Sequence, residues 1–189
     1  MFQVRIHGRG GQGVVSAAEM LSVAAFLEDK HAQAVPSFGS ERMGAPVVAF
    51  CRIDDKEIRL REPVLEPDAL IVQDPTLFTA IDVFAGLSPT GYVLVNTGRT
   101  IEELGISDAV KGLPAGHVRC VPATELALRF VKRPLPNTAL LGALASVTGV
   151  IKFESVAKAI GTKFPGNIGE ANISAAEAAY ESAQATEGG

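Results

Sequence analysis

The N-terminal stretch FQVRIHGRGGQGVVSAAEM, residues 2–20, changes its hydrophobic pattern twice within a short distance. Phe2–His7 alternates apolar and polar side chains, which is typical of a β-strand. The glycine cluster Gly8–Gly13 follows at once. Between Val14 and Glu28 the apolar residues recur at helical spacing, so one stripe of a helix can face a core. A strand, a tight turn and a helix in this order predict the first unit of an α/β domain.

The glycine cluster has the spacing of a dinucleotide-binding loop, with glycine at Gly8, Gly10 and Gly13. A nicotinamide or flavin cofactor also needs a carboxylate about 20 residues later to hold the ribose. The stretch Ala32–Ser37 contains none, and Glu41 comes too late, within a loop. The cluster is therefore either a packing turn or a site for a phosphate, a carboxylate or a partner's backbone. Gln12 favours a site, because a packing turn does not require an amide side chain.

Short apolar runs between turn residues continue the alternation of strands and helices. Strands are expected at His31–Val35, Ala69–Val72, Tyr92–Val95 and His117–Val121. Helices are expected at Ala123–Val131, Thr138–Thr148, Phe153–Gly161 and Asn167–Gln184. Asp74 is expected to cap a further helix that starts at Pro75. The alternation predicts an α/β fold with a doubly wound, mainly parallel, Rossmann-like sheet and a helical C-terminus.

One segment breaks this alternation. Val47–Ile53 and Glu57–Arg61 both have strand-like patterns and are joined by the turn residues 54–56, which predicts an antiparallel β-hairpin at one edge of the sheet. We expect residues 1–184 to form a single domain and residues 185–189 to form a frayed tail.

The composition excludes several classes of protein. The net charge is −4, and no Lys or Arg follows Lys163, so no basic face for nucleic acid is expected. The chain has 2 cysteines, too few for an iron–sulfur cluster or a disulfide framework, which indicates a reducing cytoplasmic location. No apolar run approaches the roughly 20 residues of a membrane helix, and the N-terminus has no signal-peptide core.

No catalytic constellation is evident. The histidines His7, His31 and His117 fall on separate expected strands, which indicates structural roles rather than metal ligands. Cys51 and Cys120 fall among apolar strand residues and are expected to be unreactive core thiols. The polar loop Ser37–Pro46 is the main exception, because Arg42 in it could bind a carboxylate or a phosphate. The same loop could also be an ordinary solvated surface.

Several separated stretches together resemble one family. They are Ile6–Gly13, Ser37–Pro46, Arg52–Asp55, Val72–Leu77, Arg133-Pro134 with Asn137–Ala143, and Phe164–Gly166 with Asn172 and Ala179-Tyr180. In this order they resemble the gamma subunit of the 2-oxoacid:ferredoxin oxidoreductases, in the branch of the pyruvate, 2-oxoisovalerate and aryl-glyoxylate enzymes. The resemblance extends over about residues 2–182.

The resemblance implies a role within a complex that oxidatively decarboxylates a 2-oxoacid to an acyl-CoA. In this family, alpha and beta subunits bind thiamine diphosphate with Mg²⁺, and a ferredoxin-like delta subunit carries iron–sulfur clusters. The gamma subunit carries neither cofactor and no catalytic residue. The resemblance further implies that its loops contact CoA or the alpha and beta subunits. The residues expected to do so are Gly10, Gly11, Gln12, Gly13, Arg42 and Arg133.

Two other functions remain open on the sequence. A free-standing Rossmann-type oxidoreductase or nucleotide-binding module would explain the glycine spacing, although the acidic ribose partner is missing. A scaffold subunit that binds no ligand would explain the absence of catalytic groups. The sequence of this chain does not select among 2-oxoacids or electron acceptors.

Overall fold

A six-stranded β-sheet forms the centre of the molecule, with the strand order β2-β3-β1-β4-β5-β6. The computed structural model describes residues 1–36 and 42–185 of the chain. The strands are β1 (Phe2–Arg9), β2 (His31–Pro36), β3 (Pro46–Asp54), β4 (Ala69–Val72), β5 (Tyr92–Asn96) and β6 (Val118–Val121). The helices are α1 (Val14–Phe26), the 3-10 helix η1 (Pro75–Thr79), α2 (Ser107–Val110), α3 (Ala123–Phe130), α4 (Asn137–Thr148), α5 (Phe153–Lys163) and α6 (Asn167–Ala185).

The sheet is mixed but mostly parallel. Strand β1 pairs in parallel with β4, β4 with β5, and β5 with β6. Strand β3 is antiparallel to both of its neighbours, β1 and β2. The predicted α/β class, the edge hairpin and the helical C-terminus are therefore confirmed. The expected tail lies largely outside the described residues, as does the loop segment 37–41.

The prediction of which two strands form the edge hairpin was wrong. Its two strands are β2 and β3, and Glu57–Arg61 forms no strand. Both edges of β3 are already occupied by β1 and β2, so no place beside it remains for a third strand. The side chain of Arg52 instead donates to the Glu62 carbonyl oxygen at 2.5 Å and to Gln3 Oε1 at 3.1 Å, which holds the following segment as an irregular loop.

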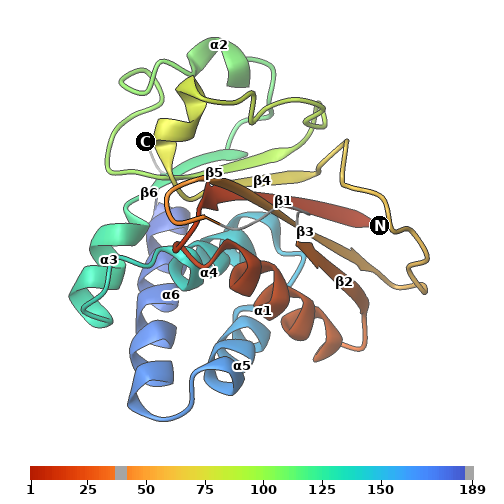
Figure 1. Cartoon of the computed structure of the whole chain (residues 1–189), viewed down its shortest axis with the longest axis vertical. Coiled ribbons are helices and arrows are strands. Elements are labelled where there is room, and N and C mark those ends of the chain that lie inside the picture. Colours follow the sequence, from red (N-terminus) through yellow and green to blue (C-terminus); the bar gives the residue numbers. More distant parts are fainter. Residues whose placement is uncertain (37–41, 186–189) are drawn as a thin grey trace.

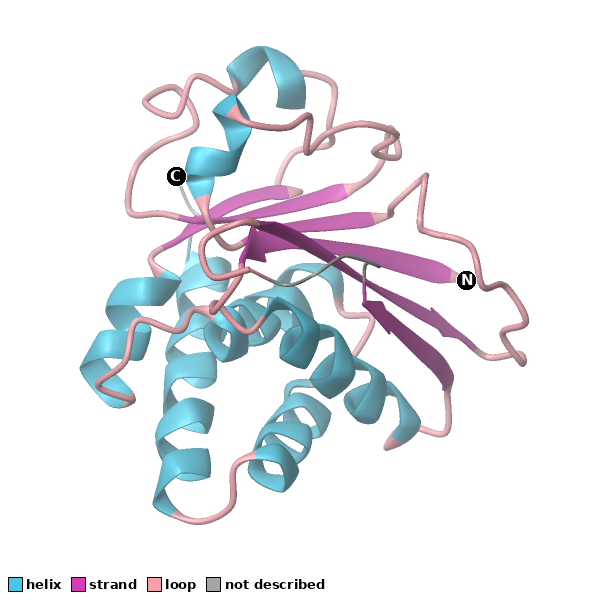
Figure 2. Ribbon diagram, in the orientation of Figure 1, coloured by secondary structure: helices cyan, strands magenta, loops and turns pink. Residues whose placement is uncertain are grey.

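The two faces of the sheet are covered in different ways. Helices α1, α3, α4, α5 and α6 all lie on one face (Figure 1). The short elements η1 and α2 and the loops around them cover the other face (Figure 2). Central strands are buried on both sides: Ile71 of β4 faces the core on the long-helix side, whereas Leu70 and Val72 face the smaller core under η1. The parallel strands β4 and β5 are therefore almost uniformly apolar, as expected for buried parallel strands.

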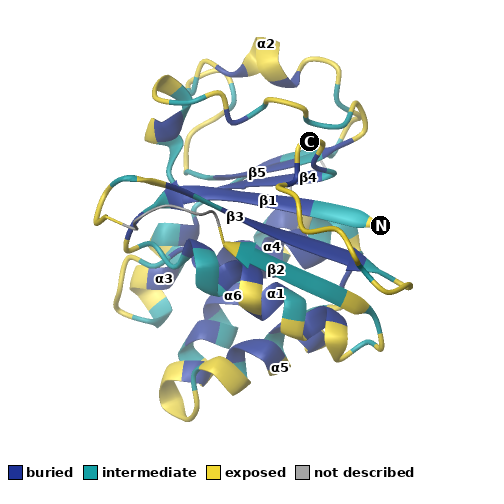
Figure 3. Cartoon of the chain, turned by 45° about the vertical axis from the view of Figure 1, so that its right-hand side comes forward, coloured by how far each residue is buried: buried dark blue, intermediate teal, exposed yellow. Residues whose placement is uncertain are grey.

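Strand β2 closes one edge of the sheet and is only partly buried, in contrast to the buried β1 and β4 (Figure 3). The sequence had located this strand, as well as β4, β5, β6 and the four long helices of the C-terminal half, to within a few residues. Asp74 caps the element that begins at Pro75, as expected, because its carboxylate accepts from the amide of Thr76. That element is a 3-10 helix.

Helix α4 is the centre of the long-helix layer, and every residue from Asn137 to Ala145 is buried. It packs closely against α6. At Gly142 a Cβ atom would lie well inside van der Waals contact with the carbonyl oxygen of Ala176. Glycine at this position therefore sets how near the two helices can approach.

Within the described residues, no helix combines the length and the apolarity needed to span a bilayer.

A buried arginine ties the opposite layer to the sheet. Arg5 of β1 donates to the carbonyl oxygens of Val83 and Ala85 at 2.9 and 2.6 Å, and its Nε donates to His7 Nε2 at 3.1 Å. His7 is buried, and its Nδ1 has no hydrogen-bond partner within the described residues. Burial, and to a smaller degree the charge of Arg5, lowers the pKa of His7 from 6.5 to about 4. The folded state therefore requires a neutral imidazole.

The low pKa of His7 predicts a loss of stability in mild acid. Below pH 6.5 the unfolded chain protonates this histidine, whereas the folded chain does so only near pH 4. The free energy of unfolding should therefore fall as the pH falls through this window, by up to about 3 kcal/mol. Urea unfolding at about pH 7 and about pH 4.5 measures the loss. His7→Gln stays neutral and should lose less stability than the wild type over the same window, since the carboxylates contribute equally to both. Equal losses would contradict the assignment.

Gly142→Ala should lower the free energy of unfolding by at least about 2 kcal/mol, because α4 and α6 must separate to make room for the methyl group. Gly112→Ala is the matched control, since a Cβ atom there would meet nothing within 4 Å. That substitution should change stability by no more than about 1 kcal/mol. Thermal and urea unfolding of the two variants provide the comparison. If the Gly142 variant were as stable as the Gly112 variant, α4 and α6 would be able to move apart without loss of stability, which would contradict the prediction.

Candidate functional site

The carboxyl ends of β1, β4, β5 and β6 meet at one edge of the sheet, because these strands are parallel. In folds of this kind, loops at the carboxyl edge form the usual ligand site. The loops here are the glycine loop Gly8–Gly13 after β1, Gln73-Asp74 after β4, Asn96-Thr97 after β5 and Pro122 after β6. Helices α1, η1 and α3 begin at the same edge. Below, this set of loops is called the carboxyl edge.

The turn at residues 42–45 closes over Gly10. The Gly10 amide donates to the Ala45 carbonyl oxygen at 2.8 Å, and the Gly44 amide donates to the Gly10 carbonyl oxygen at 3.1 Å. A Cβ atom on Gly10 would overlap the carbonyl oxygen of Arg42. This is the glycine at which a dinucleotide-binding loop lets the backbone approach a pyrophosphate. In this protein the backbone of Arg42 lies against Gly10 in place of a pyrophosphate.

Gly13 joins the starts of two helices. It caps α1 in the left-handed conformation, with φ of 71°, and a Cβ atom there would overlap the carboxamide of Asn137. Asn137 Nδ2 donates to the Gly13 carbonyl oxygen at 3.2 Å, and its Oδ1 accepts from the Thr138 amide at 2.9 Å. The start of α4 is thereby held against the start of α1.

Gln12 connects the glycine loop to the end of β4. Its Oε1 accepts from the Arg9 amide at 2.7 Å, and its Nε2 donates to Asp74 Oδ2 at 3.0 Å. Arg9 Nε lies 3.4 Å from the same carboxylate oxygen. Burial raises the pKa of Asp74, but the hydrogen bonds from Thr76 and Gln12 and the charge of Arg9 outweigh burial and lower it below its usual value. Gln12 therefore has internal partners, which the sequence alone did not indicate.

A cavity of about 290 Å³ opens beside these residues, at the ends of β4 and β5. Gln73, Asn96 and Glu125 are among its lining residues. The Asn96 carboxamide caps α3 by accepting from the Thr124 amide at 3.0 Å. Gln73 is only 1% exposed, and neither atom of its carboxamide has a partner within the described residues. Sequence reasoning assigned no role to Gln73 or Asn96; the available signal was a polar residue directly after each buried strand.

The two predicted arginines lie on different surfaces. Arg42 is exposed on the turn that covers Gly10, next to the glycine loop. Arg133 lines a separate cavity, between the end of α3 and the start of α6, with Phe164 and Asn167. Residues 37–41, which precede Arg42 in the predicted polar loop, lie outside the described residues. Gly10, Gly11, Gln12 and Gly13 are therefore together with Arg42 at the carboxyl edge, whereas Arg133 lies on the loop between α3 and α4. Neither arginine lines the 290 Å³ cavity.

The thiols are poorly suited to nucleophilic chemistry. Burial raises the pKa of Cys51 to about 12. Burial, and to a smaller degree the charge of Glu102, raises the pKa of Cys120. No group of His, Cys, Asp and Glu side chains within residues 1–36 and 42–185 could hold a metal ion. His117 stacks on Tyr92, with ring centroids 4.0 Å apart, in a structural contact.

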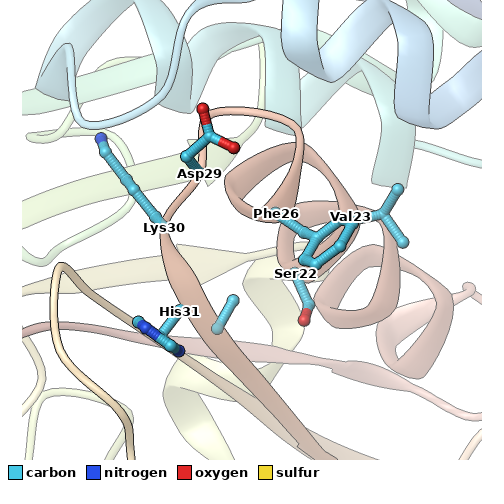
Figure 4. Close-up of a pocket in the computed structure, with 7 residues that line it drawn as sticks. Ser22, Val23, Phe26, Asp29, Lys30 and His31 are labelled. Carbon is cyan, nitrogen blue, oxygen red and sulfur yellow. The ribbon is translucent and has the colours of Figure 1, made fainter.

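A larger hollow, of about 500 Å³, lies far from this edge between the end of α1 and β2 (Figure 4). Phe26, at its border, is 75% exposed. The ammonium group of Lys30 is already used, since it donates to the Val150 carbonyl oxygen at 2.6 Å and lies 3.6 Å from the Glu28 carboxylate. The Lys30 ammonium is therefore not free to bind an anion in this hollow.

Comparison with solved structures supports the fold assignment. The pyruvate oxidoreductase subunit PORC from Thermotoga maritima superposes with a TM-score of 0.79 at 40% identity, over 96% of each chain. A 2-oxoglutarate:ferredoxin oxidoreductase from Magnetococcus marinus, whose structure has 2-oxoglutarate, coenzyme A and succinyl-CoA bound, contains the same fold. It matches 97% of this chain and 31% of that longer chain, with a TM-score of 0.77 at 17% identity.

Comparison of sequences identifies the family. The chain is 50% identical over 181 residues to the pyruvate/ketoisovalerate oxidoreductases common subunit gamma of Thermococcus litoralis, with 96% of both chains covered. The family model described as pyruvate ferredoxin/flavodoxin oxidoreductase matches residues 3–182. The chain therefore belongs to the pyruvate ferredoxin/flavodoxin oxidoreductase family and is a gamma subunit of a 2-oxoacid:ferredoxin oxidoreductase.

Proposed function

We propose that this gamma subunit holds together thiamine-binding alpha and beta subunits and a ferredoxin-like delta subunit, and that its carboxyl edge helps to bind CoA. Thiamine diphosphate with Mg²⁺ supplies the decarboxylation chemistry, and iron–sulfur clusters in other subunits accept the electrons. The gamma subunit itself catalyses no chemical step in this proposal. The complex converts a 2-oxoacid to an acyl-CoA in the cytoplasm, where unpaired cysteines stay reduced.

The residues of this chain do not fit an iron–sulfur cluster. Such clusters need several thiolate ligands close together. Cys51 lies on β3 and Cys120 on β6, and three strands of the sheet, β1, β4 and β5, separate them. We therefore assign the clusters to other subunits.

The start of α1 is the observation on which the CoA proposal depends. Within the described residues no side chain caps this helix, and its first turn contains no acidic residue. By contrast, Asn96 Oδ1 accepts from the Thr124 amide in the first turn of α3, and Asn137 Oδ1 accepts from the Thr138 amide in the first turn of α4. The uncapped amides of α1 favour an anion, and CoA carries phosphate groups. Arg9 and Arg42 add positive charge beside the same loop.

The same geometry counts against the nucleotide-binding alternative. The turn at residues 42–45 lies over Gly10, where a dinucleotide would need open space. Strand β2 ends at Pro36, without the carboxylate that holds a ribose. The pure scaffold remains the second candidate, because Gln12 and Gly13 are both used in contacts within the chain.

Assembly is tested by anaerobic purification of the tagged chain with its native partners. We expect larger partner chains to be recovered, together with thiamine diphosphate and iron. A lone, colourless protein would overturn the assembly role. Calorimetry with NAD would then test the nucleotide-binding alternative, which requires tight binding by the isolated chain.

The CoA contact is tested by placing a carboxylate in the first turn of α1. In the assembled complex, Ser16→Asp should raise the KM for CoA about threefold, because it occupies the positive end of the helix. Ser16→Asn is the neutral control and should leave this KM near the wild-type value. Arg42→Ala should also raise it.

Initial rates at varied CoA and saturating 2-oxoacid measure the effect, and size-exclusion chromatography confirms assembly. Ser16→Asp and Arg42→Ala variants that assemble and keep the wild-type KM for CoA would favour the pure scaffold. A fall in kcat without a change in KM would also contradict a CoA-binding role.

A further inference from the structure

A groove separates the end of α3 from the start of α6, on the layer of long helices. Its volume is about 350 Å³, and Arg133, Phe164 and Asn172 are among its lining residues. We call this the α3–α6 groove. The residues that the argument uses are Val131, Arg133, Leu135, Phe164, Ile168 and Asn172. The carboxyl-edge cavity shares none of them.

The floor of the groove is apolar, and the buried Asn172 side chain beneath it is already hydrogen-bonded. Val131, Leu135 and Phe164 are partly buried, and Ile168 is 62% exposed. Asn172 is buried beneath them, with its Oδ1 accepting from Thr138 Oγ1 at 2.9 Å and its Nδ2 donating to the Ile168 carbonyl oxygen at 2.9 Å. The buried part of this surface therefore offers a polar small molecule no free side-chain partner, and the other uncharged polar lining residue, Asn167, is exposed at the start of α6. An apolar side chain fits this surface better.

Arg133 places a positive charge on the lining of the groove, and two further cations are close to it in the sequence. Arg129, Lys132 and Arg133 lie within the segment 129–133, although the net charge of the chain is −4. None of the three forms an ion pair with a described residue: Arg129 lies over the Phe130 ring at 5.1 Å, and Lys132 Nζ donates to the Arg129 carbonyl oxygen at 2.8 Å. An occupant that supplied a carboxylate would neutralise this charge.

We propose that the α3–α6 groove binds an acidic, amphipathic segment of another subunit of the same complex. An apolar side chain of that segment enters between Leu135, Phe164 and Ile168, and a neighbouring carboxylate pairs with the guanidinium of Arg133. The inference rests on the proposed function, because it needs a chain that works among other subunits. It adds which surface makes the contact and the chemistry of the partner.

The test uses the intact complex, purified from cells that produce all of its subunits. Dilution followed by mass photometry gives the Kd for release of the gamma subunit. Arg133→Glu should raise this Kd about tenfold or more, and the fold increase should be smaller at high salt, which screens charges. Arg133→Lys keeps the charge and should stay within a few-fold of the wild type. Lys111→Glu, on exposed Lys111 after α2, is the matched control and should leave the Kd unchanged.

A second variant tests the apolar contact. Ile168→Ser removes an exposed side chain and should raise the Kd without changing its dependence on salt. Circular dichroism and thermal unfolding of each isolated variant establish that it folds. Wild-type Kd values for both Arg133→Glu and Ile168→Ser would overturn the inference.

Other outcomes are also decisive. An unchanged Kd with a raised KM for CoA would make the groove a CoA-binding surface and overturn docking. Concentration-dependent self-association of the isolated chain that Arg133→Glu abolishes would make the occupant a second copy of this chain, which also overturns it. A wild-type chain that binds no other subunit would overturn the proposed function first, and the inference with it.

Discussion

The close approach of backbone to backbone around the glycine loop is the constraint on which the rest of the structure depends. Gly10 admits the turn at residues 42–45, and Gly13 admits the carboxamide of Asn137 at the start of α4. Gln12 adds the link to Asp74 at the end of β4. Four segments that are distant in the sequence thus meet within one loop. A side chain at either glycine would separate them, because the space is already filled by the chain itself.

The same junction determines what the carboxyl edge can bind. Because the 42–45 turn covers Gly10, the loop does not offer the open approach that a dinucleotide uses. Among the described residues no side chain caps the start of α1, whereas Asn96 accepts from the Thr124 amide in the first turn of α3. An anion contact by α1 is therefore compatible with this packing, whereas a Rossmann-type cofactor site is not. The buried carboxamide of Gln73, without a partner among the described residues, lies at the same edge.

Much of the fold could be predicted from local sequence patterns. The error arose where a strand-like segment had no free strand edge to pair with. The apolar runs of β4 and β5 predicted buried parallel strands, because strands covered on both faces lose their polar alternation. Glu57–Arg61 had the alternation of a strand but formed none, because β1 and β2 already occupy both edges of β3. For the site, the glycine loop and Arg42 were predicted together and lie together. Arg133 was grouped with them, and it lines the α3–α6 groove, on the loop between α3 and α4.

By itself the sequence determined the α/β class, the positions of most elements, and the shortage of cysteines and clustered carboxylates for metal or cluster binding. These properties depend on periodicity and on which residue types are present, and both are local. Only the tertiary structure decided which glycine faces which backbone, which strands form the edge hairpin, and that Gln12 bonds within the chain. Such contacts join residues tens of positions apart, and their geometry depends on how the helices and strands pack, which no local pattern records.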